Sequence, residues 1–372
     1  MAHASPQTRM PRRRTVLVTG GTGTLGRELV RRLAATADAT VVVLTRDERR
    51  ARAVLPTTVS TIVGDVRAGE RLGLRESDRA ALDSRITDIV HCAAETTFNR
   101  PLDEARATNV AGTEAVLAFA RDCPRLERVA AFSTVYVAGR ATGCFGENDI
   151  GGTAGFVNSY EQSKAEMEEV VCAAATSLPV ALYRLSTIVG DSRSGEVTGF
   201  NAVHHALRLL YQGLAPMVPG NERAPVDLIP VDFAADAAHQ LFDRAFTPGT
   251  TYHLCSGADG SATLGALLDA TMAAFERYRP AWRKRSIARP AIVELETYEL
   301  FVKSVEEAGN QVLLQATRAV QAFAYQLAYP KIFDARHASA VLAPLGITPP
   351  PVLDYYERIV RWCIESNWGA PS

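Results

Sequence analysis

A tyrosine and a lysine on one predicted helix have the spacing and the chemistry of a proton-transfer pair. Tyr160 and Lys164 lie in the first turns of the stretch 158–171 (NSYEQSKAEMEEVV), which has the pattern of an amphipathic helix. Residues at positions i and i+4 share one helix face, so both side chains project in the same direction. Free tyrosine has a pKa of about 10, and a nearby ammonium group lowers it. The pair could therefore exchange a proton with a reacting oxygen.

A glycine-rich turn near the amino terminus has the form of a phosphate-binding loop. The apolar run 16–18 is typical of a strand buried on both faces of a parallel sheet, and it ends at a cluster that includes Gly20, Gly23 and Gly26. A helical pattern follows from Leu25. This order aims backbone N–H groups and a helix amino terminus at an anion. The spacing is GxxGxxG, whereas the general dinucleotide fingerprint is GxGxxG.

The residue that ends the second predicted strand indicates which dinucleotide would bind. Strand 40–45 (TVVVLT) ends at Arg46, and further arginines follow at 49–52. In a dinucleotide fold, an acidic residue here binds the ribose hydroxyls of NAD, whereas a cation accommodates the 2′-phosphate of NADP. Arg46 therefore favours NADPH. The arginines at 49–52 are also compatible with the solvated start of a helix.

Three further predicted strands have notable residues at or just after their ends. Strand 59–64 is followed by Asp65 and Val66, strand 86–91 is followed by Cys92, Ala93 and Ala94, and strand 128–134 ends in Ser133 and Thr134. Asp65 could bond an adenine amino group while Val66 packs on the ring. The small side chains at 92–94 leave room for a ligand at the carboxyl edge of the sheet. His91, at the end of its strand, is interpreted as a packed residue.

Composition indicates an ordinary globular protein. The 372 residues are 47% hydrophobic and 22% charged, with a formal net charge of −1, so no nucleic-acid partner is expected. The six cysteines form no CxxC pair and suggest thiols in a reducing compartment. No apolar run approaches the roughly 20 residues of a membrane span. We expect a cytoplasmic location, no transmembrane segment and no metal site.

Alternating strand and helix patterns predict an α/β fold with a doubly wound parallel Rossmann sheet and a smaller, mostly helical C-terminal substrate lobe. Two further strands are expected at 179–185 and 250–255. The predicted organisation is a disordered tail at 1–14, an NADP-binding domain at 15–191 and 226–256, and a substrate-binding lobe at 192–225 and 257–372. Within the lobe, amphipathic helices are expected at 291–329, with a possible break at 309–310, and at 349–368.

The motifs together resemble the extended short-chain dehydrogenase/reductases. They are TGGTGTLG at 19–26, Asp65–Val66, HCAA at 91–94, NVAGT at 109–113, FST at 132–134 and YEQSK at 160–164. The stretches around them, together with GLAPMVPG at 213–220, are similar to the thioester-reductase branch. That branch includes fatty acyl-CoA reductases and the reductase domains of carboxylic acid reductases and of peptide and polyketide synthetases. The resemblance implies NADPH-dependent reduction of an acyl thioester to an aldehyde, in some members on to the alcohol, as a biosynthetic step.

The resemblance also assigns roles to residues. Tyr160 would donate the proton, Lys164 would lower its pKa and bind the nicotinamide ribose, and Thr134 would be the second donor to the carbonyl oxygen, with Ser133 as the alternative. Asn109 would complete a proton relay with Lys164. The residues expected to hold the cofactor are Gly20, Thr22, Gly23, Thr24, Leu25, Gly26, Arg46, Asp65, Val66, Cys92, Ala93, Ala94, Tyr160, Lys164, Ser186 and Ile188.

Several alternatives stay open. The family commonly has Arg-Pro after the sixth strand, whereas this chain has Arg184 and Leu185. No carrier-protein or adenylation segment is found in the chain, so the thioester is expected on CoA or on a separate acyl carrier protein, and the protein is expected to be a monomer or homodimer. The helices at 291–329 could pack on the lobe, form a dimer seam or cover an acyl chain. Competing functions are a ketone or hydroxysteroid-type dehydrogenase, a nucleotide-sugar epimerase, and a non-catalytic NADP sensor.

Overall fold

The computed structural model describes residues 13–285 and 287–369, and it is built on a seven-stranded sheet in which every pairing is parallel. The strand order is β12-β7-β5-β4-β1-β2-β3. The strands are β1 (Arg14–Thr19), β2 (Ala39–Thr45), β3 (Ser60–Val63), β4 (Asp88–His91), β5 (Arg128–Thr134), β7 (Val180–Leu185) and β12 (Thr251–Leu254). All seven strands expected from the apolar runs are present, and the doubly wound α/β fold is confirmed.

The first strand begins one residue earlier than expected. Arg14, assigned from the sequence to the tail, is buried in β1, and residues 1–12 of the expected tail lie outside the described residues. Its guanidinium donates to Asp88 over 3.1 Å and also pairs with Asp243 of α8 (Val231–Arg244). Asp88 is fully buried at the start of β4. A buried carboxylate needs a cation partner, so Arg14 belongs to the domain core.

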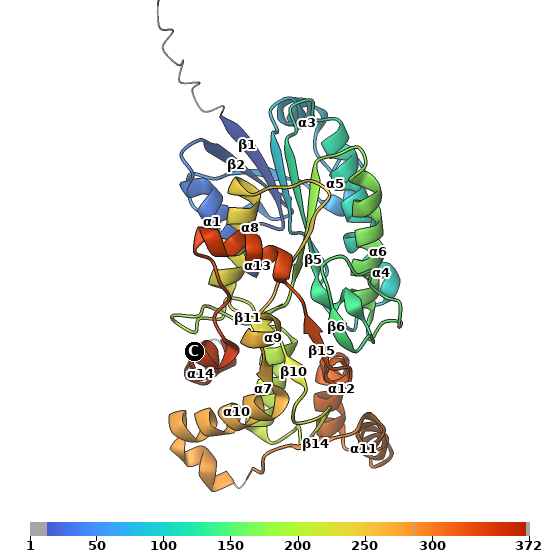
Figure 1. Ribbon diagram of the computed structural model, residues 1–372, viewed down its shortest axis with the longest axis vertical. Helices are drawn as coiled ribbons and strands as arrows, with labels where there is room; N and C mark the ends of the chain where they lie inside the picture. Colours follow the sequence, from blue (N-terminus) through green and yellow to red (C-terminus); the bar gives the residue numbers. More distant parts are fainter. Residues whose placement is uncertain (1–12, 286, 370–372) are drawn as a thin grey trace, which may run out of the picture.

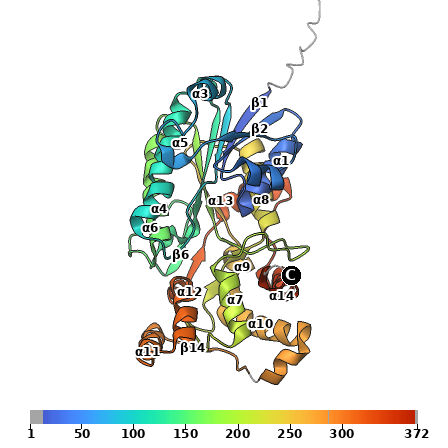
Figure 2. The same cartoon turned by 180° about the vertical axis from the view of Figure 1, so that it is seen from behind.

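Helices cover both faces of the sheet (Figures 1 and 2). One face packs against α1 (Thr24–Ala35), α8 and α13 (Arg336–Leu342). The opposite face packs against α3 (Glu76–Asp83), α5 (Ala111–Arg121) and α6 (Ser159–Ala174). Successive strand residues alternate between these two cores, since side chains along a strand point to opposite faces. Between β4 and β5 the chain forms two successive helices, α4 (Leu102–Asn109) and α5, which meet at Val110.

The remaining elements form a lobe below the carboxyl edge of the sheet (Figure 1). Its main elements are α7 (Ala202–Gln212), β9 (Met217–Pro219), α10 (Leu264–Tyr278), β14 (Ala291–Val293), α11 (Leu295–Glu307), α12 (Gln311–Leu327) and α14 (Val352–Glu365). The predicted break at 309–310 separates α11 from α12, with Gly309 at φ +65°. Across the described parts of the chain, no helix is both long and apolar enough to cross a bilayer.

One segment assigned to the lobe from the sequence packs beside the main sheet. Strand β15 (Lys331–Phe333) pairs in parallel with β6 (Gly143–Phe145), and the two form a small sheet of their own. Helix α13 follows β15 and packs against β12 and α8. Neither short strand has an alternating pattern long enough to predict, and their pairing joins positions far apart in the sequence.

Candidate active site

The glycine turn between β1 and α1 is shaped to take a bulky anion. A Cβ on Gly20, which has φ +69°, would lie 2.5 Å from the backbone nitrogen of Ala93, and one on Gly26 would lie 2.2 Å from the oxygen of Gly20. Gly23 caps α1 without a side-chain hydrogen bond, so the first-turn N–H groups remain available to a phosphate. Leu25 is buried in the core, so only its backbone faces the turn. These residues fit a dinucleotide pyrophosphate.

The end of β4 lies directly beside this turn. Cys92, Ala93 and Ala94 are half-buried there, and the backbone of 92–93 is what a side chain at Gly20 would meet. Thr19 fixes the contact, because its hydroxyl accepts a hydrogen bond from the Ala93 nitrogen over 3.3 Å. From the sequence, the small side chains are expected to leave room for a ligand. The structure adds that they allow the β1 turn and the β4 end to approach each other.

His91 is a packed residue in this arrangement. Its Nδ1 lies 2.7 Å from the Thr19 hydroxyl and its Nε2 lies 3.0 Å from the Thr113 hydroxyl. The Thr113 hydroxyl donates to the Asn109 carbonyl, so it accepts from His91 Nε2, and Nδ1 accepts from Thr19. Burial, with the charge of Lys164 nearby, lowers the His91 pKa to about 3. The ring is therefore neutral and holds the β4 end in place.

Basic groups gather where the adenosine ribose of a dinucleotide would lie. Arg46 is exposed just after β2. Asp65 follows β3, and its carboxylate accepts from the Arg67 guanidinium over 3.0 Å and from the Arg67 backbone over 2.9 Å. Partial burial disfavours the Asp65 anion, but the bonds to Arg67 and the charges of Arg67 and Arg46 hold its pKa below the usual value. Val66 is buried beneath α5, beside Gly112.

Thr134 and Tyr160 meet at the carboxyl edge of the sheet. Thr134 ends β5, where its hydroxyl donates to the Leu185 carbonyl over 3.2 Å and accepts from the Tyr136 nitrogen. Tyr160 is in the first turn of α6, and its ring lies 5.6 Å from that of Phe98, measured between centroids. Burial raises the Tyr160 pKa to about 12, and its side-chain hydrogen bond with Thr134 opposes the rise. Tyr160 is thus a protonated group at neutral pH.

Lys164 lies one helical turn after Tyr160, and its ammonium is bonded to β5. Its side chain is buried, and its Nζ donates to the Phe132 carbonyl over 2.6 Å. Burial lowers the Lys164 pKa to about 8, opposed by the charge of Glu168. The expected effect of Lys164 on the Tyr160 pKa and its contact with the ribose stay predictions.

Asn109 holds a loop in place. Its Oδ1 accepts from the Glu95 nitrogen over 2.8 Å, and its Nδ2 donates to the Glu95 carbonyl and, over 2.9 Å, to the Ser163 hydroxyl. These bonds use its side-chain oxygen and both amide hydrogens, and they tie the loop after β4 to α6. Among the described residues the Lys164 ammonium bonds to β5 and makes no direct hydrogen bond to Asn109, and the expected relay stays a prediction.

Ser133 is placed differently from Thr134. It is buried, and its hydroxyl has no hydrogen-bond partner among the described residues. Successive residues of β5 point to opposite faces of the sheet, so only one of the two can face Tyr160 from the strand end. The structure places Thr134 in that position.

Two other expected cofactor residues hold the backbone near the lobe. The Ser186 hydroxyl donates to the Asp227 carbonyl over 2.9 Å, and the Ile188 carbonyl accepts from the Asn201 side chain over 2.7 Å. Arg184, which precedes the departure from the family pattern, is buried and donates to Glu168 of α6 over 2.8 Å. It therefore anchors α6, which carries Tyr160 and Lys164, on β7.

Comparison with known proteins identifies the family. The family model described as Male sterility protein matches residues 18–238, more than half of the chain. The chain belongs to this family. Membership confirms the resemblance to the thioester-reductase branch of the extended short-chain dehydrogenase/reductases, and with it a domain that binds a nicotinamide dinucleotide.

The regions that match this Male sterility family member are parts of longer proteins. The chain is 28% identical to a linear gramicidin synthase of Brevibacillus parabrevis over 266 residues, 64% of the chain and 5% of that protein. It is 30% identical to a carboxylic acid reductase of Segniliparus rugosus over 272 residues, 61% of the chain and 23% of that protein. The crystal structure of the terminal R domain from the myxalamid PKS-NRPS pathway shares its fold, with a TM-score of 0.78, 24% identity, and coverage of 98% of this chain and 94% of that one. The chain thus spans less than a quarter of the length of these two curated relatives.

Sequence reasoning missed three groups that the structure of this family member brings to the site. Phe98 packs on Tyr160, and Arg67 lies on Asp65. The loop after β8 (Thr187–Ile188) reaches the glycine turn, because a Cβ on Gly199 would lie 2.5 Å from the Thr24 hydroxyl. The glycine at 199 was the one visible signal for this approach.

Proposed function

We propose that the protein is an NADPH-dependent reductase that converts an acyl thioester to an aldehyde. The observation that carries the proposal is the juxtaposition of Thr134 with Tyr160 at the sheet edge, beside a glycine turn that fits a pyrophosphate. Exposed Arg46 supports NADPH over NADH. The substrate lobe is proposed to comprise 192–225, 257–330 and 348–369.

The chain's residues account for the proton chemistry. The nicotinamide, when bound, supplies a hydride to the thioester carbonyl carbon. Negative charge then develops on the oxygen, and preorganised donors stabilise it. Tyr160 transfers its proton to that oxygen, which gives a hemithioacetal, and Thr134 is the second donor. Cleavage of the carbon–sulfur bond then releases aldehyde and free thiol, with the hydroxyl proton leaving on sulfur. Lys164 contributes positive charge and binds the ribose.

The proposal also covers the carrier of the acyl group and how far the group is reduced. The acyl group arrives as a thioester of CoA or of a separate carrier protein. A second reduction on to the alcohol would need Tyr160 to take up a proton from solvent, transfer it to the aldehyde oxygen, and use a second NADPH. The competing function, reduction of a ketone by another kind of extended short-chain dehydrogenase, uses the same Thr134–Tyr160 pair and differs in having no thiol product.

The test measures two products together. NADPH oxidation and thiol release are followed with acyl-CoAs and acyl-pantetheines, with NADH and ketones as comparison substrates. Tyr160→Phe is expected to lower kcat/KM by at least about 100-fold, the usual contribution of general acid catalysis. Tyr278→Phe, at a surface tyrosine bonded to Glu357, should leave it unchanged. Equal NADPH and thiol counts indicate the aldehyde, and twice as much NADPH indicates the alcohol. NADPH oxidation with ketones alone would refute thioester reduction.

A further inference from the structure

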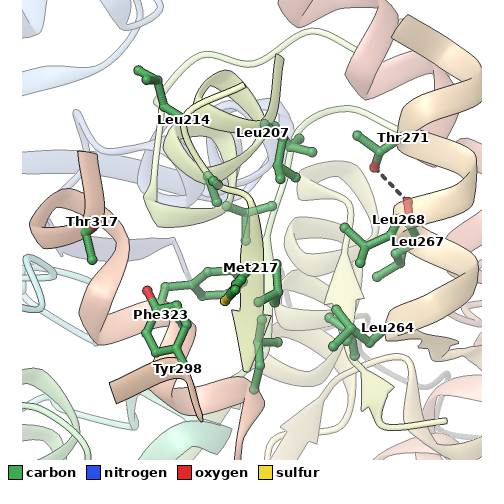
Figure 3. Close-up of a pocket in the computed structure, with 18 of the residues that line it drawn as sticks. Leu207, Leu214, Met217, Leu264, Leu267, Leu268, Thr271, Tyr298, Thr317 and Phe323 are labelled. Carbon is green, nitrogen blue, oxygen red and sulfur yellow. Dashed lines mark hydrogen bonds between the residues drawn. The ribbon is translucent and has the colours of Figure 1, made fainter. Parts of the chain in front are cut away.

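The lobe contains a large apolar pocket beside the proposed active site. It is lined by 21 residues and opens to solvent. Its walls come mainly from α7, β9, α10, α11, α12 and α14, and Figure 3 shows their side chains directed toward a common space. A concave, mostly apolar lining is typical of a site for a small organic ligand. The proton chemistry at Tyr160 makes no use of this space.

The walls offer few polar groups to a ligand, namely the hydroxyls of Thr271, Tyr298, Thr317 and Tyr356. Among the described residues that line the pocket, none is charged. The Thr271 hydroxyl donates to the Leu267 carbonyl over 2.6 Å and lies 2.8 Å from the Tyr356 hydroxyl, the dashed line in Figure 3. The Thr317 hydroxyl donates to the Leu313 carbonyl. A peptide in this pocket would bury amide groups without partners, at a cost of about 1–3 kcal/mol for each. A hydrocarbon has no such cost.

The pocket is joined to the catalytic helix at its wall. Leu327 lines the pocket at the end of α12, and the preceding residue, Gln326, donates to Glu161 over 2.6 Å. Glu161 follows Tyr160 on α6. On another wall, Leu228 follows Asp227, whose carbonyl is bonded to Ser186 just after β7. Two residues of the pocket wall, Leu327 and Leu228, are therefore each adjacent in sequence to a residue that is hydrogen-bonded to α6 or to the end of β7.

We propose that this pocket binds the acyl group of the substrate as an extended, apolar hydrocarbon chain, while the thioester carbonyl lies at Thr134 and Tyr160. The inference rests on the proposed function and names its substrate class, an aliphatic acyl thioester as opposed to a peptidyl one. Each methylene that enters the pocket is expected to strengthen binding about fourfold, which corresponds to about 0.8 kcal/mol. The increase should stop at the chain length that fills the pocket.

The first measurement is a chain-length series. Acyl-pantetheines from acetyl to palmitoyl keep the thiol constant, and a dipeptidyl-pantetheine serves as the polar comparison. We expect kcat/KM to rise about fourfold per methylene up to a plateau, and the dipeptide to fall below acyl chains of equal length. A flat series, or a dipeptide that is preferred, would overturn the inference.

Matched variants place the effect in the pocket. Ala324→Phe adds a ring to the pocket wall, whereas Ala319→Phe makes the same change at an exposed position of the same helix. The first should move the plateau to shorter chains and keep acetyl-pantetheine reduction, and the second should leave the series unchanged. Met217→Ala, which enlarges the pocket, should move the plateau to longer chains. Thermal unfolding checks that each variant is folded, and two folded pocket variants with an unchanged plateau would refute the proposal.

A binding assay separates this inference from the proposed function. Fatty alcohols from butanol to hexadecanol are used to displace cis-parinaric acid from the cofactor-free protein. Displacement that strengthens with chain length and weakens in Ala324→Phe supports the pocket even if no thioester is reduced, in which case the proposed function alone fails. Displacement that ignores chain length refutes the pocket whatever the protein catalyses.

Discussion

Arg46 offers a sharp test of cofactor choice. The side chain is exposed at the end of β2, and its charge reaches Asp65 across the expected ribose site. We expect Arg46→Ala to weaken NADPH binding while NADH binding stays the same, because only NADPH has a 2′-phosphate at this position. Arg67 is a second cation there, but its guanidinium is already paired with Asp65 at 3.0 Å. Arg67→Ala should therefore have the smaller effect.

The magnitude follows from the exposure of Arg46. Unit charges about 4 Å apart interact by about 1 kcal/mol in water and about 4 kcal/mol near a protein surface. A hydrogen bond to a charged group contributes about 1.5–3 kcal/mol. An exposed guanidinium lies at the low end of these ranges, so we expect a loss of about 1.5 kcal/mol, or roughly tenfold in Kd. Screening should shrink the difference between wild type and variant as salt rises.

The assay is titration of each dinucleotide followed by protein fluorescence at low and high salt. Arg50→Ala is the matched control, since it removes the same charge from an exposed position on α2 (Glu48–Val54) and should leave both affinities unchanged. An equal loss of NADH and NADPH binding in Arg46→Ala would show that Arg46 supports the fold of the loop. No loss of either would remove Arg46 from the site altogether.

Two further predictions concern the glycine turn and Lys164. Gly26→Ala places a Cβ 2.2 Å from the Gly20 oxygen, so it should lower the free energy of unfolding by about 1–3 kcal/mol and weaken NADPH binding. Gly146→Ala is the control, because its Cβ would meet nothing nearer than 3.5 Å and should change neither quantity. Thermal unfolding and NADPH titration measure both, and an unaffected Gly26→Ala would contradict the steric argument. Burial lowers the Lys164 pKa to about 8, so kcat/KM for NADPH should fall tenfold per pH unit above about 8 as the ammonium is lost. The free energy of unfolding should instead rise with pH between about pH 8 and the pKa of Lys164 in the unfolded chain, because in that range only the unfolded chain binds the proton. A flat profile of kcat/KM from pH 6 to 10 would refute the role of the charge.

The sequence was sufficient for the sheet and the glycine turn because both depend on local patterns. A strand buried on both faces is an apolar run wherever it occurs, and all the expected strands are in the sheet. Gly20 and Gly26 are required by contacts within a few residues of one another or with the β4 end. The residues that surround the pocket, in contrast, extend from Val203 to Tyr356, and no local pattern reports how these segments meet.

Side-chain direction was the part of the site that spacing could not predict. The i,i+4 rule correctly places Tyr160 and Lys164 on one face of α6, but it does not say where a four-carbon stem ends. Nearby acceptors decide this, and the Phe132 carbonyl takes the Lys164 ammonium. In the same way, Asn109 has an amide that the loop at Glu95 and the Ser163 hydroxyl use completely. Such competition between partners depends on tertiary structure.

The position of Tyr160 depends on three attachments of α6. Ser159 donates to backbone carbonyls of the loop at 98–100, and Arg184 binds Glu168 from β7. Glu161 accepts from the Val157 nitrogen over 2.8 Å and from Gln326 of α12. The loop, the sheet and the lobe therefore each hold the helix that carries Tyr160, the proposed proton donor. Because the Gln326 attachment adjoins the pocket wall, a chain bound in the pocket would contact α12, the lobe helix that is bonded to α6 at the residue after Tyr160.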